Sequence, residues 1–183
     1  MTPYKSLPPH IEYMISRLEL DTTSIITMTN TPFSAPIKVD NILAKMGISV
    51  HDKQQLNDGV YGSVDTDTRE ILLSKNIISD FKIRFVTCHE IGHIFYYEKQ
   101  KKHAKRHYDE ITTSGKDPEE IYANAFAASI LVPEMLLKNA LKTTRNMDLL
   151  SDIFKVSTYV IEYRIKRFFS DYVYIENGEV LDK

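Results

Sequence analysis

Residues 87–93 read Thr-Cys-His-Glu-Ile-Gly-His, so two histidines stand four residues apart and a glutamate directly follows the first. On a helix, His89 and His93 project from the same face one turn apart, where two imidazole nitrogens can bind one zinc ion. Glu90 lies about 100° further round the helix, from where its carboxylate can reach a metal-bound water without being a ligand. The pattern predicts a metal site with a carboxylate base, and its third ligand must come from later in the chain.

Chance matches to this pattern lie mostly on solvated helix faces. The residues around this motif favour a buried helix instead. We expect a helix from about Asp80 to beyond Tyr97, and its neighbouring positions are apolar: Phe85, Val86, Ile91, Ile94 and Phe95. Buried imidazole and carboxylate groups need partners, and a metal ion would supply one for all three.

Composition bounds the class of protein. With 183 residues, 43% hydrophobic and 26% charged, the chain has the make-up of one globular domain with at most a small appendage. The net charge of −2 gives no general electrostatic case for nucleic-acid or membrane binding. Cys88 is the only cysteine, which excludes an internal disulfide and is typical of a reducing cytoplasm. We interpret Cys88 as a small core residue rather than a third ligand.

The N-terminus has no apolar signal region, and no run of 18 apolar residues occurs, so we expect a cytoplasmic protein. We divide the chain into an N-terminal helix and connector (1–35), a core (36–133) and a C-terminal helical segment with a terminal hairpin (134–183). The first part should hold a helix over 10–20 and a Thr/Ser-rich connector over 21–36. The core should hold a short helix closed by Gly47, a strand over 48–50 and a hairpin of 60–64 with 69–73. Strand 71–73 is our candidate edge for pairing with an extended substrate.

A second helix can complete the metal site. Asp117 as N-cap and Pro118 after it predict a helix that runs to Leu131. Glu120 and Asn124 are four residues apart and share a face of that helix. Glu120 could complete a His-His-Glu ligand set, with Asn124 orienting a histidine ring. The alternative, that Glu120 only caps the helix, would be favoured if the first motif were absent.

Two further segments carry basic residues. Residues 98–110 are rich in lysine, arginine and histidine, and we favour a solvated extension of the helix over contact with an acidic partner. Residues 147–154 and 158–169 flank Lys155-Val156-Ser157 in a pattern typical of a helix-turn-helix. Arg164, Lys166 and Arg167 give its second helix a predicted basic edge. We favour packing or substrate docking over DNA binding for this pair. Asn177-Gly178 predicts a tight turn between strands 172–175 and 180–181.

Both motifs are similar to those of the ImmA/IrrE-type metallopeptidases. Residues 84–93, Arg-Phe-Val-Thr-Cys-His-Glu-Ile-Gly-His, resemble the RFTxAHELGH stretch of that family. Residues 120–133 resemble its ExxANxFAxxLLxP block, and 46–50 its LGI-x-V segment. The resemblance covers roughly residues 36–168. Many members carry a histidine four residues after the second ligand, where this chain has Tyr97. Several also carry a glutamate just before the Ala-Asn pair, where this chain has Tyr122, which leaves Glu120 or Glu119 as the candidate third ligand.

The resemblance implies an α+β, zincin-like metallopeptidase domain with a small mixed sheet, followed by a small helical segment. It implies that His89, His93 and Glu120 hold Zn²⁺, or another divalent metal such as Mn²⁺, and that Glu90 is the catalytic base. One side chain should stabilise the oxyanion, and the sequence does not choose among Tyr96, Tyr97, His103, His107 and Tyr108.

The resemblance further implies a protein substrate, a helix-turn-helix transcriptional repressor whose cleavage relieves repression of a mobile element or stress regulon. The alternative is a non-proteolytic anti-repressor that binds and sequesters its partner. An intact base at Glu90 favours the enzyme, because sequestration needs no proton acceptor. A direct DNA-binding regulator is a third hypothesis, which the net charge of −2 disfavours.

Overall fold

A computed structural model describes residues 8–100, 105–109 and 117–183, with the backbone alone for 105–109. The helices are α1 (Pro9–Ser16), α2 (Leu18–Met28), α3 (Val39–Met46), α4 (Asp80–Gln100), α5 (Pro118–Leu131), α6 (Glu134–Ala140), α7 (Met147–Phe154) and α8 (Thr158–Phe168). The strands are β1 (Ser49–Gln54), β2 (Val60–Asp65), β3 (Glu70–Ser74), β4 (Lys105–Asp109), β5 (Val173–Glu176) and β6 (Glu179–Asp182). The predicted α+β class is confirmed.

The larger sheet is mixed, as predicted, and has the order β1-β3-β2-β4. β1 pairs with β3 in parallel, for example Val50 with Ile71, whereas β2 is antiparallel to both β3 and β4. The prediction that residues 71–73 form a free edge is therefore wrong. β1 and β2 cover the two sides of β3, so its backbone groups are already paired, and a peptide that extends this sheet has to pair with β1 or β4.

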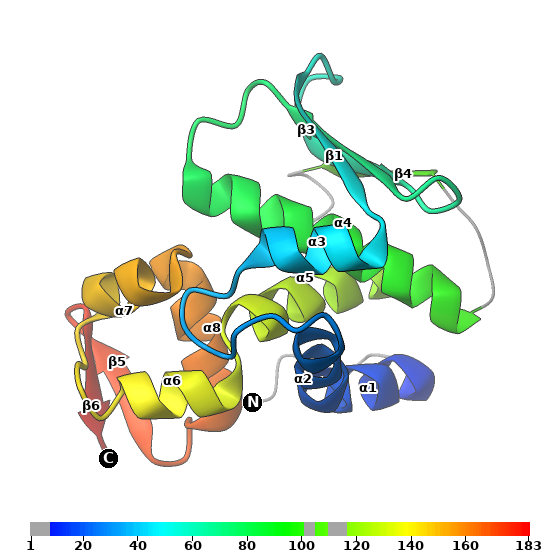
Figure 1. Cartoon of the computed structure of the whole chain (residues 1–183). Coiled ribbons are helices and arrows are strands. Elements are labelled where there is room, and N and C mark those ends of the chain that lie inside the picture. Colours follow the sequence, from blue (N-terminus) through cyan, green and yellow to red (C-terminus); the bar gives the residue numbers. More distant parts are fainter. Residues whose placement is uncertain (1–7, 101–104, 110–116) are drawn as a thin grey trace.

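α4 lies between the sheet and α5, with the sheet on one side and α5 on the other (Figure 1). This position explains why the helix is apolar on all sides: every residue from Val86 to Ile94 is buried, the motif included. The predicted start at Asp80 is confirmed, and the helix extends beyond Tyr97 to Gln100. The motif is thus a central part of the core.

α5 begins as its sequence predicts. The Asp117 side chain accepts a hydrogen bond from the Glu119 amide at 3.2 Å, and Pro118 occupies the first helical position, where its missing N–H costs nothing. The cap fixes where the helix starts, and therefore on which turn Glu120 lies. Small residues face the rest of the core along this helix, with Ala123, Ala127 and Ala128 all buried.

The N-terminal part differs from the prediction. Residues 21–28, predicted as connector, continue α2, which ends at Met28. The hydroxyl groups that favoured a connector are satisfied inside the helix, because Thr22, Ser24 and Thr27 each donate to the carbonyl four residues before. α1 and α2 both pack against α5, so this segment forms part of the core that supports the site.

The C-terminal helices and the β5–β6 hairpin follow the sequence prediction. α7 starts at an Asn146 cap, whose side chain accepts from the amides of Asp148 and Leu149 at 3.0 Å each. Asn177 and Gly178 have φ of 50° and 79°, as the predicted tight turn requires. α8 packs against α5 as well as α7, so the segment is attached to the core.

Arg164 does not lie on a basic edge of α8, and this prediction is wrong. The side chain is fully buried. Its guanidinium donates to the Val132 carbonyl at 2.8 Å, to the Ser129 hydroxyl at 3.0 Å and to the Glu19 carboxylate at 2.6 Å. Burial lowers its pKa, and the Glu19 charge opposes that shift. The guanidinium therefore links α8 to the end of α5 and to α2.

Within the described part of the chain, no single helix has the length and apolar character that a membrane crossing needs. α5 and α6 satisfy that test only as a pair, and they meet at a bend of 50°.

Candidate metal centre

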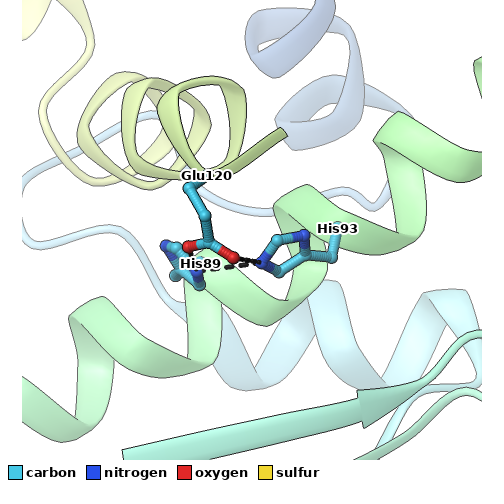
Figure 2. A group of neighbouring side chains, drawn as sticks. All are labelled: His89, His93 and Glu120. Carbon is cyan, nitrogen blue, oxygen red and sulfur yellow. Dashed lines mark hydrogen bonds and ion pairs between the residues drawn. The ribbon is translucent and has the colours of Figure 1, made fainter. Parts of the chain in front are cut away.

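Three side chains from α4 and α5 converge on one point, as Figure 2 shows. His89 and His93 bring their Nε2 atoms to 3.0 Å from each other. The Glu120 carboxylate lies across from them, with Oε2 at 3.2 Å from His89 Nε2 and Oε1 at 3.3 Å from His93 Nε2. The candidate ligand atoms all lie within 4.8 Å of one another and all three residues are buried. These residues could hold a metal ion.

Gly92 allows the two helices to approach closely enough for this arrangement. A Cβ atom at that position would lie 2.9 Å from the Cα of Ala123 and 3.1 Å from its carbonyl oxygen. These contacts are with the α5 backbone, which cannot rotate away as a side chain can. The pairing of a glycine on α4 with an alanine on α5 therefore sets the helix separation at which Glu120 reaches the histidines.

Asn124 determines which nitrogen of His89 carries a hydrogen. Its amide oxygen lies 3.0 Å from His89 Nδ1 and accepts from it. The proton is then on Nδ1, so Nε2 offers its lone pair toward His93 and Glu120. Burial lowers the pKa of His89, and contact with Glu120 opposes this in part. A neutral imidazole is the form that binds metals.

The charge of Glu120 suits the same purpose. Burial raises the pKa of its carboxyl group, but the contacts with His89 and His93 outweigh burial and bring the pKa to about 2. The carboxylate oxygens of Glu120 and the Nε2 atoms of the two histidines thus face one buried point. A divalent cation there would satisfy all of them together, and an N,N,O donor set is one that zinc accepts.

Glu90, the residue after His89, lies beside this cluster. The side chain is fully buried, and neither carboxylate oxygen has a hydrogen-bond partner among the described residues. Burial raises its pKa well above the ordinary value, and the Glu120 charge raises it further. A nearby cation would favour the ionised form. The orphaned carboxylate is therefore a second observation that fits a metal ion at this site.

The side chains predicted as oxyanion donors are only partly described. Tyr97 donates its hydroxyl to the Glu119 carboxylate, one residue before Glu120. Tyr96 is buried and its ring packs against those of Tyr97 and Tyr122. His103 lies outside the described residues. His107 and Tyr108 belong to β4, where only the backbone is described, so the choice of donor stays a prediction.

Cys88 directly precedes His89 in the sequence, but it is not part of the ligand cluster. Its thiol is fully buried, and burial raises its pKa to about 12. The thiol is therefore protonated at neutral pH when no metal is bound, and the group of described side chains that could hold a metal does not include it. Its interpretation as a core residue agrees with this environment.

The family model for the IrrE N-terminal-like domain, peptidase family M78, matches residues 43–166, which is more than half of the chain. This chain belongs to that family. The match includes both motifs of the metal centre and continues through α6 and α7 into α8. Membership of this family supports a metallopeptidase-type or an IrrE-like regulator function.

One solved structure, a Mycobacterium tuberculosis transcriptional regulator, is similar to this IrrE-like chain with a TM-score of 0.61 at 18% sequence identity. The similarity covers 81% of this chain but 46% of the other, so this chain spans less than half of that regulator. At this identity the likeness concerns the fold. No curated protein matches this chain.

Of the two adjacent glutamates that could be the third ligand, the geometry favours Glu120, which contacts both histidines, over Glu119, which contacts Tyr97. Replacing Glu120 by glutamine removes the charge between the two histidines and should weaken zinc affinity by more than about 100-fold, beyond the cost of losing an outer hydrogen bond. Glu119→Gln keeps an oxygen that can accept from Tyr97, so its affinity should stay near wild type. Competition with a chromophoric chelator measures both. The reverse order would place the ligand at Glu119.

Proposed function

We propose that this chain is a zinc-dependent endopeptidase that cleaves a helix-turn-helix transcriptional repressor and so relieves repression. One observation carries the catalytic part of the proposal: a buried His-His-Glu set faces one point beside the buried Glu90 carboxylate, which has no hydrogen-bond partner in the described part of the chain. A purely structural metal site needs the ligands but has no use for the second carboxylate. Membership of a peptidase family supports the same interpretation.

Each residue of the centre has a role in the proposed reaction. His89, His93 and Glu120 would hold the ion, and Asn124 would keep His89 in the ligating tautomer. Zinc bound by such a set supplies Lewis acidity, which polarises a peptide carbonyl and makes a water molecule more acidic. Glu90 would accept a proton on its carboxylate as water attacks the carbonyl. It would then return that proton to the leaving amine.

The substrate class rests on family likeness. The ImmA/IrrE-type motifs are typical of peptidases that act on transcriptional repressors, and the similar solved structure is itself named a transcriptional regulator. The α7–α8 pair, which resembles a helix-turn-helix, would serve packing or substrate docking. The competing function is a non-proteolytic anti-repressor that holds its partner intact.

The test is a cleavage assay with a candidate repressor, chosen by looking for a helix-turn-helix protein encoded beside this chain's gene. Zinc-loaded protein should convert that repressor into two fragments, which mass spectrometry would identify. Treatment with 1,10-phenanthroline should stop the reaction, and added zinc should restore it, because the ligand set persists in the folded chain. Stable complex formation without any fragment, whether or not metal is present, would favour the anti-repressor instead.

A further inference from the structure

Gly62 on β2 lies directly against the Glu90 side chain. A Cβ atom at position 62 would be 2.6 Å from Glu90 Oε1 and 3.3 Å from its Cδ, and also 2.6 Å from Cγ1 of Val86. Carbon atoms do not approach a carboxylate oxygen so closely, so any side chain at this position would displace one of its neighbours. The contact joins the sheet to the helix that bears the motif.

The backbone gives no reason for glycine at this position. Among the glycines that the structure describes, Gly47, Gly59 and Gly178 have positive φ, and Gly62 does not. In an ordinary strand conformation, alanine would lower the conformational entropy of the unfolded chain and stabilise the protein. The reason for glycine is therefore steric: the position leaves no room for a side chain beside Val86 and Glu90, both of which are fully buried.

We infer that Gly62 is a positioning residue. Because it has no side chain, the Glu90 carboxylate can lie directly against β2, and we call this contact the seat of Glu90. The sheet thereby fixes the side chain from the side opposite α5. Because Glu90 has no hydrogen-bond partner among the described residues, packing against β2 is what the structure offers to hold it. The catalytic part of this inference rests on the role proposed for Glu90 above.

The two contacts of an added Cβ can be separated by mutation. Val86→Ala removes the methyl group that a Cβ at position 62 would meet, and the added methyl would occupy part of the vacated space. In the double variant Gly62→Ala/Val86→Ala, the conflict that remains is with the Glu90 carboxylate. Any further effect of adding Gly62→Ala to the Val86→Ala variant therefore measures the steric conflict with the Glu90 carboxylate.

Thermal stability tests the seat without any measurement of activity. In the Val86→Ala background, Gly62→Ala should lower the Tm by about 5 °C or more when Glu90 is present, as overpacking of a core does. In the Val86→Ala/Glu90→Ala background it should change the Tm by less than about 2 °C or raise it. An equal loss in both backgrounds would overturn the inference, because the conflict would then lie elsewhere.

Kinetics and metal content test the catalytic consequence. Gly62→Ala/Val86→Ala should bind zinc like Val86→Ala alone, and its kcat on the repressor should be about 100-fold lower with KM little changed, as for a misplaced catalytic group. Equal kcat in the two variants would overturn the positioning role. If the wild type cuts no repressor, the proposed function fails, and the Tm comparison still decides whether the seat exists.

Gly92→Ala provides the matched comparison. Its added Cβ would meet the α5 backbone at Ala123, 2.9 Å away, and not a catalytic side chain. It should therefore push α4 from α5 and weaken zinc binding. Loss of zinc from Gly62→Ala/Val86→Ala to the same degree as from Gly92→Ala would contradict a role specific to Glu90.

Discussion

Glu90→Gln is expected to abolish repressor cleavage while the protein keeps its fold and its metal. Glutamine has nearly the shape of glutamate but cannot accept a proton at neutral pH, and a positioned general base contributes about 10²–10⁴-fold to rate. The fold should survive because the carboxylate has no hydrogen-bond partner to lose among the described residues. An uncharged amide should also be easier to bury than the ionised group.

The measurement follows the repressor by mass spectrometry during incubation with wild type or variant, both loaded with zinc. Binding of the intact repressor to Glu90→Gln should persist, and a reporter in cells should remain repressed with the variant. The reporter assay distinguishes the proposed endopeptidase from the non-proteolytic anti-repressor. If the variant derepresses the reporter as well as wild type does, and neither protein yields a fragment, sequestration is the function and the metal is structural.

Local patterns predicted most of the fold that surrounds the site. The ends of α4 and α5 follow from an apolar run, an aspartate cap and a proline, all of which act within a few residues. The same is true of α7, α8 and the hairpin at Asn177-Gly178. Because helix periodicity places His89 beside His93, the pairing on α4 could also be predicted. The spacing of Glu120 from Asn124 indicates Glu120 as a candidate third ligand.

Residues 21–28 were mispredicted for a local reason, since their hydroxyl groups bond within α2. The other errors arose where distant parts of the chain decide the outcome. Arg164 lies on the same stripe of α8 as Val160, Ile161 and Ile165, so its burial could have been predicted from the period. Its charge suggested solvent, and its partners Glu19 and Val132 are too distant in sequence to be foreseen.

Two features of the larger sheet were also not predicted because they depend on contacts between distant residues. β3 became a central strand because β1 pairs with it in parallel, and the hairpin sequence carries no sign of that partner. Gly62 is the second feature, because a glycine inside a strand signals close approach of another group. The sequence does not indicate that the approaching group is the Glu90 carboxylate.

Replacing either motif histidine by alanine should remove the metal. In each case two ligands remain of three, and the lost imidazole leaves a buried gap beside a carboxylate that is ionised. Since loss of a hydrogen bond outside the ligand shell alone costs about 10–100-fold in affinity, loss of a ligand should exceed that. His51→Ala is the matched control, because His51 is an exposed histidine on β1.

Metal analysis by mass spectrometry, on protein purified under mild conditions and dialysed against zinc, tests the site most directly. Wild type and His51→Ala should hold about one zinc per chain, and His89→Ala and His93→Ala should hold almost none. Full occupancy in both His89→Ala and His93→Ala would contradict the account, because the metal would then be bound elsewhere.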